Sequence, residues 1–244
     1  MQIYSDQFLS IYFGDAQAEL TRDQLMNTRV GDSLWANSEL AQVKKLLPIV
    51  DLFVLRQEHG VQGVTITAQS SETLHGTQLV GDFLITDVPQ RGLLVYTADC
   101  VPLVIYDPVT HAVGLCHAGW RGSVSRVACV MLHEMMSAFG TDPRFVRVFF
   151  GPSAQVCCYT VSPDFREQFE GLWYKDALFD QRDSQLFFDL VALNRLQLES
   201  CGVPQGAFCV KYSACTLENS SFCSARRDSK KGSRARQATI VSLK

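Results

Sequence analysis

Six short apolar runs, each bounded by Gly, Pro, Asp or other turn-forming residues, limit most strongly how this chain can fold. They are rich in Val, Ile, Leu and Tyr, and they lie at 52–57, 62–68, 82–86, 92–97, 101–106 and 112–117. Runs of this length and composition predict β-strands. None approaches the roughly 20 apolar residues that a membrane-spanning helix needs, so we expect no association with a membrane.

Helical patterns are interspersed with these strands. Apolar residues recur on one stripe over 123–139, and Gly140 is suited to end that helix. Further helices are expected from Ser162, and from Asp189 to about Ser200. Three more strands are expected, at 145–150, 206–212 and 237–243. Because strands and helices do not alternate regularly, the pattern predicts a mixed α/β (α+β) fold with one domain over residues 1–244.

Charge and cysteine content narrow the class of protein. The net charge is −3, which gives the chain no general attraction for nucleic acid or anionic membranes. The stretch MQIYSDQFLSIYFGD lacks the basic and apolar segments of an export signal, so we expect a cytoplasmic protein. The nine cysteines are then expected to be reduced. No C-x-x-C pair occurs, which excludes the usual zinc-ribbon and thioredoxin spacings.

Three strand ends carry side chains that ligate metals. His59 and His117 each end a strand-like run and precede a small residue, and Cys100 ends the run LLVYTADC. Two imidazoles and one thiolate suit zinc, which in catalytic sites takes three protein ligands and keeps a fourth position open. Residue types alone leave a second interpretation equally open, namely a buried cysteine and two hydrogen-bonded histidines.

A thiol nucleophile is a competing hypothesis for the same residues. Cys100 and His117 would form the catalytic pair, with Asp99 orienting the imidazole. However, neighbouring residues of a regular strand face opposite sides, and Asp99 directly precedes Cys100. Asp99 is therefore better suited to hold a metal ligand or to cap the backbone.

A basic stretch near the C-terminus, RRDSKKGSRARQ at 226–237, carries six cations and one anion. It is consistent with a solvated loop, or with an anion site, because arginine forks match phosphate oxygens. Binding of nucleic acid is a third interpretation of this basic stretch. The negative net charge and the lack of a nucleic-acid-binding motif argue against it.

Five motifs occur together in the order typical of one family. They are QEHG at 57–60, TADCVPL at 97–103, HAGWRG at 117–122, GPSAQVCCYTV at 151–161 and FCSARRDSKKGSRARQA at 222–238. The chain resembles the YfiH/laccase-domain family, also called the polyphenol oxidase or multicopper oxidase-like family, which includes purine nucleoside phosphorylase-like proteins. The segment NTRVGDSLWANSELAQ at 27–42 resembles the family's N-terminal segment, so the resemblance covers nearly the whole chain.

The resemblance implies a fold and a ligand set. The fold would be a single layered α-β-β-α domain, and the metal would be held by His59, Cys100 and His117. The implied chemistry is phosphorolysis of adenosine, inosine, guanosine and methylthioadenosine, together with hydrolytic deamination of adenosine. Purine nucleosides and phosphate would therefore be the partners of the site.

Roles for further residues follow from that resemblance. Zinc would activate water for deamination, and Asp99 would orient a ligand or the substrate. Phosphate would be held by Arg121, Arg226 and Arg227. The chain departs from the family pattern at Ser38, Thr160, Ala225 and Ala235. These departures leave the metal ligands unchanged and bear on substrate preference and phosphate binding.

The copper-oxidase part of the family name receives less support from the residues. A multicopper oxidase needs many more histidines than the five in this chain, of which His111 and His133 are expected to face solvent. Zinc is therefore the expected cofactor, and copper can occupy the three-ligand site adventitiously. A cysteine hydrolase using Cys100 and His117, a copper-dependent polyphenol oxidase, and a metal-stabilised interaction protein without turnover are the alternatives.

Overall fold

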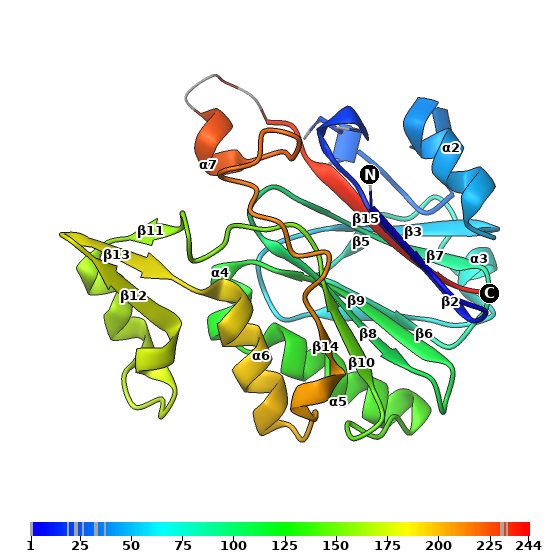
Figure 1. Ribbon diagram of the computed structural model, residues 1–244. Coiled ribbons are helices and arrows are strands. Elements are labelled where there is room, and N and C mark those ends of the chain that lie inside the picture. Colours follow the sequence, from blue (N-terminus) through cyan, green and yellow to red (C-terminus); the bar gives the residue numbers. More distant parts are fainter. Residues whose placement is uncertain are drawn as a thin grey trace.

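Two six-stranded sheets lie face to face in the described part of the chain, with helices on their outer sides (Figure 1). The computed structural model describes all residues except 1, 19, 22, 23, 26, 32, 33, 37, 230, 231 and 233. The order of strands in the first sheet is β1 (Gln2–Ser5), β2 (Leu9–Phe13), β15 (Gln237–Leu243), β7 (Arg91–Thr97), β3 (Asp51–Arg56) and β5 (Leu79–Val80).

The second sheet is a mixture of antiparallel and parallel pairs. Its order is β14 (Phe208–Cys209), β10 (Arg147–Phe150), β8 (Val101–Asp107), β9 (Ala112–Ala118), β6 (Phe83–Thr86) and β4 (Gly63–Ile66). A small third sheet, at the left of Figure 1, consists of β11 (Thr160–Val161), β13 (Gln185–Phe188) and β12 (Phe179–Arg182). The six strands expected between residues 52 and 117 are all present, with ends shifted by at most two residues.

The strands at the centre of the stack are apolar on both faces, and one of these faces packs against the other sheet. Leu93 and Val95 of β7 pack between the sheets against Val104 of β8, whereas Leu94 faces the opposite side of its own sheet. This period of two is the signature of a strand that is buried on both faces by different partners. The core between the sheets also includes Leu115 of β9.

Helices cover the outer face of each sheet. On the second sheet lie α5 (Val127–Phe139) and α6 (Leu190–Ser200), and on the first lies α2 (Ser38–Leu46). The expected mixed α/β fold and its α-β-β-α layering are therefore confirmed. No helix among the described residues combines the length and the apolar character that crossing a bilayer requires. The shorter helices of the described part of the chain are α3 (Ser70–Thr73), α4 (Trp120–Val124) and α7 (Ala225–Asp228). The 3₁₀ segments described there are η1 (Ala16–Ala18), η2 (Leu34–Ala36), η3 (Pro163–Phe169), η4 (Lys175–Leu178) and η5 (Gln205–Ala207).

The helix expected over 123–139 is wrong in its first turn. The chain forms α4 directly after β9 and then breaks, because Arg126 adopts a left-handed backbone with φ of +65°. The break separates α4 from α5, so the short helix can follow the end of β9 without continuing the axis of the longer one. The expected end at Gly140 is confirmed, since Gly140 is left-handed and its amide bonds to the carbonyl of Met136.

Two other expected elements differ from the structure. The helix expected from Ser162 is a 3₁₀ segment, η3, which ends at Phe169 and receives no cap from the Ser162 side chain. The strand expected over 206–212 shrinks to β14, because η5 occupies the residues before Phe208 and the chain leaves the sheet after Cys209. The helix expected from Asp189 is confirmed, with the Asp189 carboxylate accepting a bond from the amide of Ala192.

Candidate metal centre and pocket

The structure brings His59, Cys100 and His117 together at one edge of the two-sheet stack. One ligand atom of each lies within 4.8 Å of the others, and the Cys100 Sγ is 3.9 Å from the His59 Nε2. The two imidazole rings stand at 86° to one another. With Zn–S of about 2.3 Å and Zn–N of about 2.0–2.1 Å, a tetrahedral zinc site has an S···N separation of about 3.6 Å. The 3.9 Å between Cys100 and His59 is close to this value.

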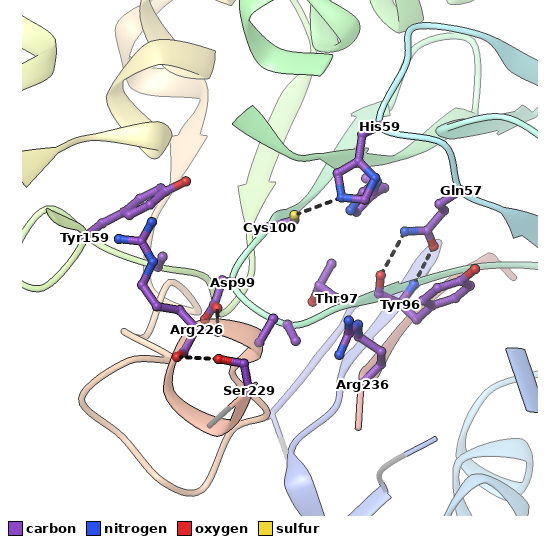
Figure 2. A pocket seen from close by; sticks show the side chains of 14 residues that line it. Gln57, His59, Tyr96, Thr97, Asp99, Cys100, Tyr159, Arg226, Ser229 and Arg236 are labelled. Carbon is purple, nitrogen blue, oxygen red and sulfur yellow. Dashed lines mark hydrogen bonds between the residues drawn. The ribbon is translucent and has the colours of Figure 1, made fainter. Parts of the chain in front are cut away.

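The three donors come from both sheets. His59 follows β3 of the first sheet, and His117 lies near the end of β9 in the second. Cys100 sits in the bend through which the chain passes from β7 to β8, and hence from one sheet to the other. Figure 2 shows the Cys100 sulfur directed at the His59 ring.

Asp82, which was not singled out in the sequence, organises both histidines. Its carboxylate is fully buried, and its Oδ1 lies 2.8 Å from the Nδ1 of His117, which is only 3% exposed. The same carboxylate accepts bonds from the amides of Glu58, His59 and Gly60 at 3.3, 2.9 and 2.7 Å. These contacts hold His59 in a left-handed backbone with φ of +61°. They also leave the Nε2 of His117 as the nitrogen available to a metal.

The electrostatics of the centre favour a charged Cys100. Burial alone would raise the pKa of its thiol, but His117 and the hydrogen bonds from both histidines outweigh burial and lower the pKa to about 6. Burial lowers the pKa of His117, whereas Cys100 and Asp82 raise it more strongly, to about 9. Between these values the thiolate and the imidazolium form an ion pair, which is the state that a metal would displace.

Two glycines of the HAGWRG motif make room for the centre. A Cβ on Gly119 would lie 2.8 Å from the Cδ2 of His59 and 3.1 Å from the Cys100 sulfur. A Cβ on Gly122 would lie 2.8 Å from the carbonyl oxygen of Gly60. Any larger residue would therefore push the ligands or the His59 loop out of place.

A pocket of about 630 Å³ opens in front of the three donors. Figure 2 shows that Tyr159 and Arg226 line one side of it, and that Gln57, Tyr96 and Arg236 lie on the other. The side-chain amide of Gln57 exchanges two 2.9 Å bonds with the backbone of Tyr96. Gln57 therefore fixes the strand that leads to His59, and Arg236 joins the candidate residues that the sequence did not single out.

Asp99 does not contact His117. Its carboxylate accepts bonds from the Thr216 hydroxyl at 2.6 Å and from the Arg226 backbone amide at 2.7 Å. It thus caps the backbone of α7 and ties that helix to the bend that carries Cys100. The orienting role that the thiol-nucleophile hypothesis gave to Asp99 is occupied by Asp82 instead.

The three arginines expected to bind phosphate have different settings. Arg226 lines the pocket, where its guanidinium stacks 4.7 Å from the Tyr159 ring and bonds to the Thr160 carbonyl. The Arg227 guanidinium is used internally by Asp228 and by the carbonyls of Thr216, Asn219 and Phe222.

Arg121 is exposed and stacks 4.4 Å from the Trp120 ring, and it is not among the residues that line the pocket. Of the three arginines, Arg226 lines the pocket, and Arg236 lines it as well. The signal for Arg236 was present in the basic stretch, but the sequence does not show which of its cations face inward.

One departure from the family pattern, Ala225, lines the pocket. The Thr160 carbonyl accepts the bond from Arg226, a role that depends on the backbone and not on the side chain. Ala235 directly precedes Arg236. The side chain of Ser38 and, within the basic stretch, residues 230, 231 and 233 lie outside what the structure describes.

An α-β-β-α stack with two histidines and one cysteine gathered at a pocket defines a class of candidate metal-dependent proteins. The chain belongs to the family described as multi-copper polyphenol oxidoreductase laccase, which matches residues 26–244. The family inferred from the motifs is thereby confirmed. The crystal structure of Bacillus licheniformis hypothetical protein YfiH has a TM-score of 0.77 and 27% identity, over 97% of this chain and 93% of that one.

Two curated relatives carry names that bear on activity. A purine nucleoside phosphorylase of Clostridium acetobutylicum is 28% identical over 202 residues, which cover 83% of this chain and 76% of that protein. Adenosine deaminase RL5, from an unknown prokaryotic organism, is 34% identical over 60% of this chain and 56% of its own length.

Proposed function

We propose that this chain is a zinc-dependent purine nucleoside enzyme, which catalyses phosphorolysis of adenosine, inosine, guanosine and methylthioadenosine and hydrolytic deamination of adenosine. The observation that carries the proposal is the joint placement of three metal donors and the Arg226 guanidinium on one pocket of about 630 Å³. Relatives named for both reactions support it. A pocket of this size accommodates a nucleoside and an anion together.

The donor set fits zinc. His59, Cys100 and His117 supply two imidazole nitrogens and one thiolate at suitable spacing, and the pocket lies on the open side of the set. Bound there, zinc would supply Lewis acidity and lower the pKa of a water molecule toward neutrality. Asp82 would keep the His117 imidazole in the tautomer and orientation that ligation needs.

Phosphorolysis requires an oxyanion next to the ribose. A phosphate oxygen bonds to C1′ while the bond from C1′ to the purine nitrogen breaks, and its electron pair leaves with the base. Arg226 would hold the phosphate, with Arg236 on the opposite side of the pocket. Burial raises the pKa of Tyr159 to about 12, so its hydroxyl keeps its proton near pH 7 and is available as a hydrogen-bond donor to the substrate.

A panel of purine nucleosides, each assayed with and without phosphate, tests the proposal. Zinc-loaded protein should convert adenosine and phosphate to adenine and ribose 1-phosphate, and should release some inosine and ammonia from adenosine alone. The Cys100→Ser variant should lose both reactions, whereas Cys209→Ser, a cysteine outside the pocket, should keep them. Absence of product from every nucleoside at full zinc loading would refute the proposal.

A cysteine hydrolase is favoured by one specific observation. Cys100, His117 and Asp82 are arranged as nucleophile, base and orienting carboxylate, with the pKa of the thiol lowered to about 6. Exhaustive chelation distinguishes the two functions. A cysteine hydrolase keeps its activity without metal, whereas the purine nucleoside enzyme loses it and regains it when zinc is restored.

The polyphenol oxidase alternative has no comparable support among the described residues. Two groups of ligand-bearing side chains are present there, and one of them contains histidine. His75, His111 and His133 are exposed and belong to neither group. A multicopper cluster would require several more histidines beside the first three donors. Sustained oxidation of a phenol by copper-loaded protein would nevertheless revive this function.

A further inference from the structure

A second cluster of metal-ligating side chains lies outside the pocket. The loop after β10 carries Cys157 and Cys158, and the segment after β14 carries Cys215 and Glu218. Three sulfur atoms and one carboxylate oxygen of these residues lie within 4.8 Å of one another. The Cys157 Sγ is 3.9 Å from the Glu218 Oε2. We call this group the Cys157 cluster.

The backbone holds the two segments of the cluster in register. Ser153 and Cys215 form a parallel bridge, in which the Ser153 amide bonds to the Ala214 carbonyl and the Thr216 amide to the Ser153 carbonyl, both at 3.0 Å. Arg182 bonds to the carbonyls of residues 156 and 157 at 3.1 Å each. Backbone hydrogen bonds therefore hold together the two segments that carry the donors of the cluster.

Cys215 has the surroundings of a metal-bound thiolate. It receives hydrogen bonds from the backbone amides of Gln155, Glu218 and Leu217. Cys215 and Glu218 are three residues apart, the spacing of the C-x-x-C pairs in many zinc sites, with a carboxylate in the second position. Amide donors around a sulfur fix its orientation and offset its negative charge.

We propose that Cys157, Cys158, Cys215 and Glu218 form a second zinc site with three thiolates and one carboxylate. Zinc accepts all these donor types and prefers four ligands in a tetrahedron. With Zn–S of about 2.3 Å and Zn–O of about 2.0–2.2 Å, tetrahedral geometry places a sulfur and a carboxylate oxygen about 3.6 Å apart, and the Cys157 Sγ and the Glu218 Oε2 are 3.9 Å apart. Four protein donors leave no position for substrate, so the site is structural, in contrast to the open set at His59.

The cluster is placed to stabilise the wall of the pocket. Tyr159, which lines the pocket, directly follows Cys158, and Thr216, which bonds to Asp99, directly follows Cys215. Zinc at the cluster would lock together the two segments that carry these side chains. The inference rests on these contacts and stands whether or not the pocket processes purine nucleosides.

Zinc content of purified full-length protein tests the proposal. Under a reductant that keeps the thiols free, the double variant His59→Ala/Cys100→Ser removes the first centre and should retain about one zinc ion per chain after dialysis against zinc and then buffer. Adding Cys215→Ser to this variant should remove that zinc. Cys209→Ser in its place should not, because Cys209 lies outside both groups of donors.

Cobalt binding tests whether thiolates are the ligands of the second site. In the His59→Ala/Cys100→Ser background, Co²⁺ should give strong thiolate-to-metal charge-transfer absorption, which Cys157→Ser and Cys215→Ser should each weaken. Glu218→Gln, at an exposed position, should keep the fold and weaken zinc binding at least about tenfold. A correctly folded double variant without bound zinc, or zinc content unaffected by Cys215→Ser, would overturn the proposal.

Discussion

One buried carboxylate sets the geometry of the candidate metal centre at the scale of single residues. Asp82 bonds to the His117 ring and to three consecutive backbone amides that lead up to and past His59. Hydrogen bonds from His117, Gly60 and His59 lower the pKa of Asp82 in spite of its burial, which by itself would raise it. The carboxylate is therefore ionised at neutral pH and supplies the charge that both histidine segments share.

Replacing Asp82 with Asn should weaken zinc binding by about 10- to 100-fold. The amide has one acceptor oxygen, so its NH₂ group would face either the Gly60 amide or the His117 ring as a second donor. Zinc affinity is measured by competition with a chelator, in the Cys215→Ser background so that one centre contributes. Asp87→Asn, at an exposed position after the other end of β6, is the control. Equal affinity in Asp82→Asn and the control would contradict this role.

Zinc affinity at the centre should depend on pH in a defined direction. The pKa of His117 is about 9 and that of Cys100 about 6, so between these values the free centre holds one proton that zinc must displace from His117. The association constant should rise about tenfold per pH unit from about pH 6 to about pH 9. It should rise more steeply below pH 6, where the Cys100 proton must also leave.

Calorimetric titrations in buffers of different ionisation enthalpy measure this proton release directly. At about pH 7.5 the Cys215→Ser protein should release about one proton per zinc bound. His133→Ala, an exposed histidine on α5, should behave identically. A pH-independent affinity between about pH 6 and pH 9 would show that His117 is already neutral in the free protein.

One short element, α7, contributes Ala225 and Arg226 to the wall of the pocket. The N-terminal residues of α7 lie against the bend that carries Cys100, because Asp99 accepts the Arg226 amide and Ser224 caps the helix. Arg227 then fastens the helix to the preceding loop through three carbonyls. Arg226 thus faces the pocket, whereas its neighbour Arg227 holds in place the helix that carries Arg226.

The different contacts of Arg226 and Arg227 predict different outcomes when each is replaced with alanine. Arg226→Ala should lower phosphorolysis by about 10- to 150-fold in kcat/KM through a higher KM for phosphate, and should affect deamination less. Arg227→Ala should lower both reactions together and should destabilise the fold by about 1–3 kcal/mol, because three backbone carbonyls lose their donor. Steady-state kinetics with varied phosphate, together with thermal unfolding, separate the two effects. Equal losses of both reactions in Arg226→Ala would contradict a phosphate-binding role.

Elements that carry a local signal were predictable from the sequence, and elements fixed by distant partners were not. The six expected strands between residues 52 and 117 follow from their short apolar runs and the turn residues that bound them, and α6 follows from its cap at Asp189. The break at Arg126 has no local signal, since only a positive φ at a non-glycine residue reveals it. Strands β12 and β13 are short and partly exposed, so their pattern does not stand out.

Some residues of the candidate site were also predictable from the sequence, and others were not. His59, Cys100 and His117 stand in distinctive motifs, whereas Asp82 looks like an ordinary strand start until its contact with His117 is seen. The Cys157 cluster escapes a search for C-x-x-C pairs because its donors come from two segments joined only by the fold.

For the whole molecule, the candidate metal centre connects the two sheets. The first sheet supplies His59, the second supplies His117, and Cys100 lies in the crossover that links them. Elsewhere the sheets are held together by apolar contacts, such as those of Leu115 and Val95. At this edge the stack ends in the pocket, which separates the ends of the strands. A metal ion that binds donors from both sheets would supply the missing connection.

Removing zinc should therefore destabilise the entire fold and not only the pocket. Free zinc at 100 times the dissociation constant stabilises the folded state by about 2.7 kcal/mol. For a chain of this size that corresponds to a rise in Tm of about 5–11 °C. Scanning calorimetry of Cys215→Ser protein, with zinc and after chelation, isolates the centre. His59→Ala should abolish most of the shift, and His133→Ala should preserve it. If chelation left the Tm unchanged while zinc was shown to leave, the centre would not join the sheets, and apolar packing alone would hold this edge.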